Sequence, residues 1–363
     1  MIQLAKKLNV VHDPSIIRHM FNESKENIKK RIMNYMKASA FIPLEWIIPL
    51  RFIINIPKDC RLYIEPGSRM VNYKNGYICY LENGIGLFSF NTKKINKINV
   101  FLLRLKIKSR SFKGFVYYSH AAKKSKESLF DKVGLSDLNG YKDIAVIPPY
   151  TKDLPIKKTR ECKRILFCSS SFNLKGGREV VKAFHKIKAV YNVELILVTN
   201  VSSIDKSLNL DDVTLIEFNL SPQDYQDIVN NVDLVIHPTY FDTHALSMLE
   251  AIKSGIPAIV TNTFALTEYI SDGMNGIVIN NPYNPFDCNY QYIGFKGTMI
   301  DYAKYMNSRL PISDALVEDI VVAVNEMLTN YSRYKYHSEC LPYKELTEKR
   351  ILQQWNIVIG KFI

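Results

Sequence analysis

Two carboxylates in the second half of the chain are spaced so that both could bind the same ligand, one at each end. Asp242 follows the apolar run 234–236 in a polar turn, and Glu250 lies two helical turns further along segment 245–253, which has helical composition. A second apolar run, 256–260, comes next. This order predicts a strand, a turn, a helix and a second parallel strand, a unit in which the amino terminus of the helix favours an anion. The pattern therefore predicts a phosphate-bearing ligand, with one carboxylate near its head and the other near its tail.

A lysine and two glycines stand in a similar unit upstream. Residues 164–184 are predicted to form a strand, a loop and a helix, and the loop contains Lys175, Gly176 and Gly177. Glycine lets a backbone approach a pyrophosphate closely, and lysine supplies a mobile positive charge. Taken alone, each segment has a plainer interpretation: a capped helix with a solvated Glu250, and an exposed lysine beside a turn. Their combination favours a phosphate site.

Together the two segments resemble the donor site of retaining glycosyltransferases with the GT-B fold, in particular family 4, glycosyl transferases group 1. In that family two acidic residues are separated by seven others; here Asp242 replaces the usual first glutamate and Glu250 keeps the second. The resemblance implies that Asp242 binds hydroxyls of the transferred sugar and that Glu250 binds the ribose of the nucleotide. It also implies that Lys175 and the backbone amides of Ala245 and Leu246 meet the pyrophosphate.

The sequence departs from the family pattern at one phosphate-binding position. Aligned on the Lys-Gly pair at Lys175 and Gly176, Ser169 and Ser170 stand where the family usually has glycine and arginine. One expected cation is therefore missing. Two substitutes remain open: Arg178 in the first turn of the following helix, or the serine hydroxyls acting as neutral donors.

Three further segments complete the resemblance in this half. Phe218 and Asn219 follow a predicted strand, and by resemblance their loop lines the nucleobase pocket. Thr243 and His244 would surround the sugar. Residues 264–279 resemble the loop and hairpin that follow the second strand in the family, with Asp-Gly and Asn-Gly pairs that supply turns.

Four polar residues in the amino-terminal half follow predicted strands and are candidates for the acceptor side: His12, Glu82, Asn83 and His120. Family members often place a histidine or an acid where Glu82 stands, facing the reacting carbon of the sugar. Glu82 is therefore a candidate for orienting the acceptor, or for acting as the general base toward its hydroxyl. Ordinary turn roles for Glu82 and His120 remain open. The glycine pair that the family commonly has after its first strand is absent.

The order of elements predicts an α/β protein, and the resemblance implies GT-B architecture, in which two Rossmann-like, doubly wound domains face each other across a cleft. Residues 1–150 would form the acceptor-binding domain and residues 151–342 the donor-binding domain. The boundary is marked by a strand that runs into the proline-rich stretch 144–155. Residues 343–363 have helical spacing, and the resemblance implies a final helix that crosses back to the first domain.

Charge and composition limit the partners. The chain of 363 residues has a net charge of +13, which favours anionic partners. The sources left open are nucleic acid, an anionic membrane, or an amino-acid usage rich in Lys, Asn, Ile and Tyr. Nucleic acid is not favoured, because the lysines are spread over both halves and no nucleic-acid motif accompanies them. Six cysteines without ligand spacing predict reduced thiols, neither a disulfide framework nor a metal site, and a cytoplasmic location.

Two segments bear on contact with a membrane. No apolar stretch reaches membrane-spanning length, so a soluble protein is predicted. Residues 41–56 are strongly apolar but are interrupted by prolines and charges. Burial in the core is favoured for them, with a shallow membrane contact as the alternative. A helix predicted at about 15–37, after a strand at 8–11, carries a basic face that is the other candidate for peripheral contact with anionic lipid.

The sequence thus predicts a glycosyltransferase that moves a sugar from a UDP- or GDP-linked donor to an acceptor hydroxyl, without a metal or other cofactor. Retention of configuration is implied by the resemblance alone. Glycan, lipid-linked and protein acceptors all fit. Two alternatives remain open: a catalytically inactive GT-B scaffold or basic nucleotide- or nucleic-acid-binding protein, and a sugar-nucleotide epimerase or glycan phosphorylase built on the same scaffold.

Overall fold

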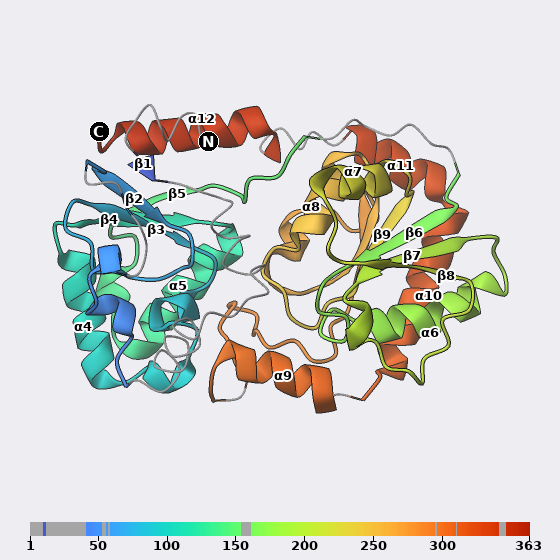
Figure 1. Cartoon of the computed structure of the whole chain (residues 1–363), viewed down its shortest axis with the longest axis horizontal. Helices are drawn as coiled ribbons and strands as arrows, with labels where there is room; N and C mark the ends of the chain where they lie inside the picture. Colours follow the sequence, from blue (N-terminus) through green and yellow to red (C-terminus); the bar gives the residue numbers. More distant parts are fainter. Residues whose placement is uncertain are drawn as a thin grey trace. The chain divides into compact units, whose positions relative to one another are not determined.

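The computed structural model divides the chain into two compact units. Unit 1 comprises Met1–Pro148, Asp287–Asp301 and Leu352–Ile363, and unit 2 comprises Pro149–Phe286 and Tyr302–Ile351. Each unit contains one sheet in which all paired strands run parallel (Figure 1). The structure describes residues 10–11, 41–52, 56, 59–153, 161–294, 296–309, 311–340 and 346–363.

The sheet of unit 1 has five described strands that lie side by side in chain order. The second and third strands are buried along their whole length, as expected for parallel strands covered on both faces. Helices follow the third and fourth strands at their carboxyl ends. The strands are β1 (Val10–Val11), β2 (Leu62–Glu65), β3 (Tyr77–Leu81), β4 (Phe112–Tyr117) and β5 (Asp143–Val146); the helices are η1 (Leu44–Trp46), η2 (Leu50–Phe52), η3 (Gly84–Phe88), η4 (Thr92–Lys94), α4 (Lys97–Lys108), α5 (His120–Val133) and η5 (Ser136–Leu138).

The sheet of unit 2 has the order β11-β10-β9-β6-β7-β8. The chain starts in the middle at β6, moves outward to β8, and returns to build the other half from β9. The strands are β6 (Arg164–Cys168), β7 (Glu194–Thr199), β8 (Val213–Glu217), β9 (Leu234–His237), β10 (Ala258–Thr261) and β11 (Gly276–Ile279); the helices are α6 (Gly177–Lys188), η6 (Val201–Ser203), α7 (Pro222–Asn230), α8 (Leu246–Lys253), η7 (Phe264–Glu268), α10 (Asp314–Thr329) and α11 (Tyr331–Cys340).

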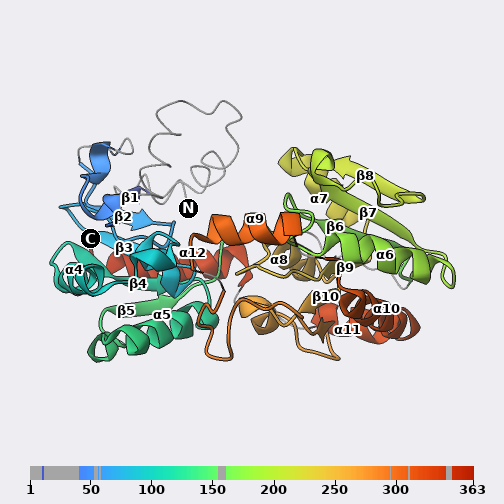
Figure 2. The same cartoon turned by 90° about the horizontal axis from the view of Figure 1, so that it is seen from below.

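Helices cover both faces of the second sheet, so each strand alternates between two cores. On one face, α7 and α8 pack on Leu166, Val198 and Val235. On the other, α6 lies against α10 (Figure 2). Two helices contain residues of both units: α9 (Met299–Arg309) and α12 (Glu348–Gly360).

Local signals in the sequence place several of these elements. Ser119 caps α5 by accepting the N–H of Ala122, and Ser221 forms a capping box with Asp224 at the start of α7, where Pro222 occupies the first turn. Such caps satisfy backbone donors that the helix itself leaves unpaired. A serine directly before each helix, with a proline at the first position of α7, is the sequence signal of these two helix starts.

Two predictions about connections differ from the structure. The hairpin expected within 264–279 is wrong, because β11 pairs parallel with β10 after a crossover through η7. Residues 287–301, which the sequence placed in the donor domain, belong to unit 1. This segment belongs to unit 1 because it is bonded to residues there: Thr92 exchanges hydrogen bonds with Gly297, and Asn91 forms a β-bridge with Thr298.

The apolar segment 41–56 is divided between core and surface. Trp46, Leu50 and Ile56 are buried, as predicted, whereas Phe41 and Phe52 are exposed. Of the strand predicted at 8–11, the described residues form β1. The helix predicted at 15–37 lies outside the described residues.

Candidate functional site

The candidate donor site lies in unit 2, where the chain reverses its direction across the sheet. β6 and β9 are neighbours, but β6 continues to β7 on one side and β9 to β10 on the other. Ligands of such sheets bind outside the carboxyl ends of the strands at this switch point. The loop that carries Lys175 follows β6, and the loop that carries Asp242 follows β9, so the fold brings the two predicted motifs together.

The two loops touch at a glycine. Gly176 has a φ of +78°, and a Cβ atom added to it would lie 2.3 Å from the carbonyl oxygen of Pro238. A side chain is therefore excluded both by backbone conformation and by space. Tyr240 N donates to the carbonyl of Leu174 at 3.1 Å, which joins the loops again. This close approach fixes the position of Lys175.

Asp242 is the centre of the site, because five donors converge on its carboxylate. Oδ2 accepts from Lys175 Nζ at 2.6 Å and lies 3.0 Å from Nε2 of His237. Oδ1 accepts the backbone N–H groups of Thr243, His244 and Ala245 at 2.7, 3.0 and 3.0 Å. The carboxylate thus holds together the lysine of one loop, the end of β9 and the turn that leads into α8.

The electrostatics of this cluster favour an ionised carboxylate. Burial alone would raise the pKa of Asp242, but the positive charge of Lys175 and the hydrogen bond from His237 outweigh it. They hold the pKa of Asp242 well below its usual range. Lys175 Nζ also donates to the carbonyl of Phe241 at 2.5 Å. The lysine is therefore fixed by two oxygens while 15% of its side chain remains exposed.

Helix α8 begins beside Asp242 in an unusual conformation. Ala245, directly before its first residue Leu246, is left-handed with φ +44° and ψ +70°. The resemblance implies that the Ala245 amide binds the pyrophosphate, but here this amide already donates to Asp242. An anion at this helix would have to bind further along the first turn, which begins at Leu246.

Glu250 lies on α8 and faces the end of β6. The helix is tied to that strand because Ser247 Oγ donates to the carbonyl of Cys168 at 3.3 Å. Burial and the negative charge of Glu250 raise the pKa of the Cys168 thiol to about 12, which places the carboxylate near that strand end. Lys175, Asp242 and Glu250 thus all border the switch point formed by β6 and β9.

The three candidates for replacing the missing phosphate-binding cation, two serines and an arginine, follow β6. Ser169 is buried, and its Oγ accepts the N–H of Ser171 at 3.1 Å, which leaves the hydroxyl proton free to donate. Ser170 is exposed, and its carbonyl accepts from Asn200. Arg178 is nine-tenths buried in the first turn of α6, 3.9 Å from Glu179. Within the described residues, its Nε and Nη2 atoms have no hydrogen-bond partner.

The remaining predicted donor residues are placed as follows. Phe218 and Asn219 follow β8 and are exposed, with Phe218 N bonded to the carbonyl of Thr199. Thr243 and His244 are buried in the turn before α8. Their predicted contacts with the nucleobase and the sugar remain predictions.

The acceptor-side candidates lie in unit 1. Glu82 directly follows β3, and its N–H donates to Ser68 Oγ at 2.7 Å. Asn83 is buried and caps η3 by accepting the N–H of Gly86. His120 is the first residue of α5 and is exposed. Asn83 therefore has a structural role, whereas Glu82 and His120 keep their predicted roles as hypotheses. His12 lies outside the described residues.

Two contributors to the site were missed by sequence reasoning. His237 is 3% exposed and ends β9, where its ring contacts Asp242. Asn281 donates to the carbonyls of Thr239 and Tyr240 and so supports the β9 loop from the end of β11. His237 could have been found from the sequence, because it is a polar residue at the end of an apolar strand. No local signal existed for Asn281, which is far away in the sequence.

Part of the chain that contains this site is similar to a known protein family. Residues 150–288 match the family described as glycosyl transferases group 1. The resemblance predicted from the sequence is confirmed for this segment. A stretch of 61 residues is also 33% identical to the lipopolysaccharide glucosyltransferase WaaG of Escherichia coli strain K12; it covers 17% of this chain and 16% of that protein.

Solved structures with a similar fold cover most of the chain. The GtfA/B complex matches with a TM-score of 0.57 and 14% identity over 83% of this chain and 57% of that one. HepE of Anabaena, in complex with UDP and glucose, and a sucrose-phosphate synthase of Thermosynechococcus elongatus both match with TM-scores of 0.54 and 11% identity. They cover 83% of this chain, and the matches span 78% and 73% of the respective relatives. With the two parallel-sheet units, these matches show that the protein has the predicted GT-B fold.

Two kinds of feature are absent from the described residues. No helix among them is both long and apolar enough to cross a membrane. No group of three or more His, Cys, Asp or Glu side chains among them is arranged to hold a metal ion.

Proposed function

We propose that the protein transfers a sugar from a nucleotide-sugar donor to an acceptor hydroxyl, with retention of configuration and without a bound metal. The observation that carries the proposal is the cluster of Lys175 and Asp242 at the switch point between β6 and β9, beside the start of α8. The match of residues 150–288 to glycosyl transferases group 1 supports the reaction class.

Lys175 has the central role in the proposed chemistry. Departure of the nucleoside diphosphate builds negative charge on the phosphate that leaves the sugar. An ammonium group already held in place stabilises this charge without reorganising at the moment of reaction. Asp242 and the carbonyl of Phe241 hold Lys175 Nζ in position. Because the lysine gains most when the charge develops, it should affect turnover more than donor affinity.

Asp242 would act in two ways. The five donors on its carboxylate make it the residue that positions Lys175 and the turn before α8. Its side chain remains 15% exposed, and we assign the exposed side to a hydroxyl of the transferred sugar. Glu250, near the end of β6, is assigned to the ribose.

The missing phosphate-binding cation is assigned to Arg178. The side chain is nine-tenths buried with two nitrogen atoms that lack hydrogen-bond partners in the described part of the chain. Buried guanidinium donors left in this state favour an anionic partner. Ser169, directly after β6, can add a hydroxyl group as a neutral donor to the phosphate.

The donor nucleotide is assigned to UDP or GDP, and the acceptor to a glycan, a lipid-linked saccharide or a protein. UDP is favoured because HepE and a pneumococcal O-GlcNAc transferase, two proteins with a similar fold, were solved in complex with UDP. On the acceptor side, Glu82 is assigned to orienting the hydroxyl or accepting its proton.

A thermal-shift screen against UDP-, GDP-, ADP- and dTDP-sugars tests the donor site, because a ligand that binds the folded state raises the melting temperature. We expect a shift with one nucleotide that is lost in Glu250→Ala and kept in Glu318→Ala, an exposed glutamate on α10. No shift with any donor, in folded protein, would favour an inactive scaffold.

Product analysis then tests the reaction itself. Incubation with the selected donor and an acceptor mixture should give a glycoside whose anomeric configuration, read by NMR, matches the donor. Turnover should persist in the presence of a chelator. Conversion of the donor to an epimeric nucleotide sugar, with no glycoside formed, would replace transfer by epimerisation.

A further inference from the structure

Unit 1 carries an exposed apolar surface that the proposed sugar transfer does not use. It is formed by segment 41–52 and by one side of α4. Its large side chains are between 51% and 82% exposed, which is unusual for so many neighbours. The members, called the apolar patch below, are Phe41, Ile47, Phe52, Ile98, Phe101 and Leu105.

Contacts show that the two segments form one surface. Asn99 of α4 donates through Nδ2 to the carbonyl of Phe41 at 2.9 Å. Ile47 and Leu105 line the same cavity of about 270 Å³, whose wall also contains Trp46. Trp46 is 4% exposed, and its indole N–H has no acceptor within the described residues. Two members of the patch therefore border a cavity whose wall includes this indole with its unused donor.

Helix α4 is apolar on two sides. Leu103 and Ile107 are buried toward the sheet of unit 1. Ile98, Phe101 and Leu105 follow the spacing i, i+3, i+7 and form a second stripe that faces outward. A helix that only covered a sheet would need the first stripe alone, so the outward stripe points to a partner.

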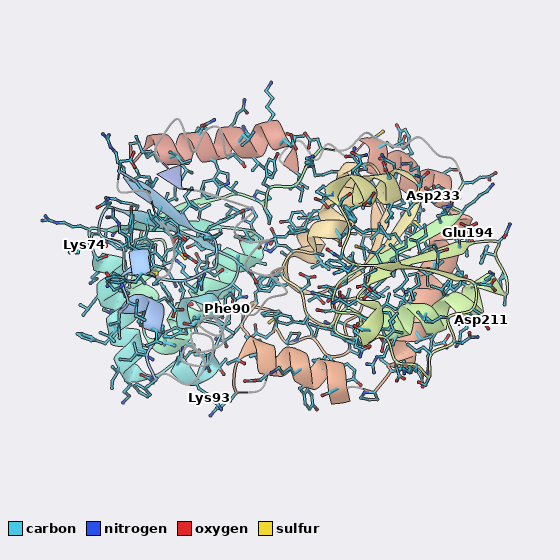
Figure 3. The ribbon with its side chains drawn as sticks, in the orientation of Figure 1. Lys74, Phe90, Lys93, Glu194, Asp211 and Asp233 are labelled. Carbon is cyan, nitrogen blue, oxygen red and sulfur yellow. The ribbon has the colours of Figure 1, made fainter. Side chains whose placement is uncertain are left out.

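Most of the charges around the patch are positive, and an exception is Asp137, which pairs with Arg104 of α4 at 2.5 Å. Lys97 and Lys108 lie within roughly 40° of Phe101 around the helix axis, on one border of the stripe. The one acid of segment 41–52, Glu45, is 3% exposed and accepts a hydrogen bond from Ser89. Lys93 points away from unit 1, as does Lys74 (Figure 3). Residues 91–113 contain no acid but carry Lys93, Lys94, Lys97, Arg104, Lys106, Lys108, Arg110 and Lys113.

We propose that the apolar patch docks the protein on the surface of an anionic lipid bilayer. Phe101, Leu105 and Ile47 enter the boundary between head groups and acyl chains, while Lys97 and Lys108 meet lipid phosphates. Half of the patch is aliphatic, and aliphatic side chains fit acyl chains but cannot stack on bases as aromatic rings do, so nucleic acid is the poorer fit. A second copy is disfavoured because a two-fold contact would bring the same basic borders together.

Vesicle co-sedimentation of the full chain tests the proposal, and it needs no sugar donor. We expect binding to vesicles of equal parts phosphatidylcholine and phosphatidylglycerol, and much weaker binding to phosphatidylcholine alone. The double variant F101S/L105S should bind at least about tenfold more weakly, because both apolar anchors are lost. The double variant K97Q/K108Q should lose about tenfold on the anionic vesicles and little on the neutral ones.

The controls use residues that are equally exposed elsewhere. Val322→Ser on α10 removes a side chain that is 66% exposed, and Lys182→Gln removes a lysine that is 46% exposed on α6. Both should bind vesicles like the wild type, and melting temperatures should show that all variants are folded. The proposal is overturned if the wild type stays in the supernatant, or if the patch variants sediment like the controls. It is also overturned if the patch mutations abolish RNA binding or dimerisation but not vesicle binding.

Discussion

A lysine–aspartate pair occurs in each unit, and the two pairs have opposite settings. In unit 2, Lys175 Nζ lies 2.6 Å from Asp242, and both side chains are 15% exposed. In unit 1, Lys126 Nζ lies 2.9 Å from Asp143, and the lysine is completely buried. The chemistry is the same, but the first pair joins two loops at the ends of strands and the second joins helix α5 to strand β5.

Their surroundings explain what each pair can do. Lys126 lies between 5.0 and 5.6 Å from the ring centres of Phe115, Tyr117 and Phe130. Burial lowers the pKa of Lys126, and the charge of Asp143 opposes that change. The ammonium group of this pair is closed to a ligand, so the lysine serves packing. Lys175 instead lies on a loop that a rigid sheet positions, which is the common setting of functional residues.

The largest expected effect is on turnover. Lys175→Met should lower kcat by about 1,000-fold, because a charge aimed at the leaving diphosphate is lost. Its donor affinity should fall much less, since the lysine acts mainly in the transition state. Steady-state kinetics with the donor identified by thermal shift measure both kcat and the change in apparent donor affinity. Lys182→Met, which changes an exposed lysine on the neighbouring helix, is the control, and wild-type turnover in Lys175→Met would refute the role of Lys175.

The next effect belongs to the buried pair. Lys126→Met should lower the free energy of unfolding by about 3 kcal/mol, because Asp143 is left with an incompletely paired charge. The turnover of the folded enzyme should not change. Urea unfolding gives the stability, with Lys123→Met, at a site 40% exposed, expected to stay within about 0.5 kcal/mol of the wild type. Equal losses in the two variants would show that Lys126 has no special role.

The contact between the two loops can be tested through glycine. Gly176→Ala combines left-handed backbone strain with a clash against Pro238, whereas Gly273→Ala has a φ of +74° and no atom within 4 Å. We expect losses in the free energy of unfolding of about 3 and about 1 kcal/mol, respectively. Chemical unfolding of both variants measures the two effects: Gly273→Ala reports the backbone strain alone, and the additional loss in Gly176→Ala reports the clash. If the two losses are the same, the loops do not meet as described.

The smallest expected effect is a gain. Ala245→Gly relieves a left-handed residue at the start of α8 and should raise the free energy of unfolding by up to about 1 kcal/mol. Ala251→Gly, inside the same helix, should lower it by about 1 kcal/mol or more. Melting curves of the two variants should therefore shift in opposite directions. A destabilised Ala245→Gly would mean that the turn beside Asp242 depends on the alanine methyl group.

Much of the fold could be predicted from local signals. The apolar runs before Asp242 and before Ser169 gave β9 and β6, and the caps at Ser119 and Ser221 gave two helix starts. These features depend on residue propensities and on hydrogen bonds within a few residues, so they can be predicted from neighbouring residue types. The spacing of Asp242 and Glu250, together with Lys175, was enough to indicate the family confirmed for residues 150–288.

Other features depended on contacts between residues far apart in the chain. The sequence did not reveal that Asp242 would be shared by Lys175, His237 and three amides, because those donors meet only after β6 and β9 pair. It predicted burial for segment 41–56, yet part of that segment faces outward beside α4. The sequence by itself determined which elements form and which residue types reach the strand ends. Only tertiary structure decided which charges meet and which apolar side chains remain exposed, because both depend on neighbours that chain order does not specify.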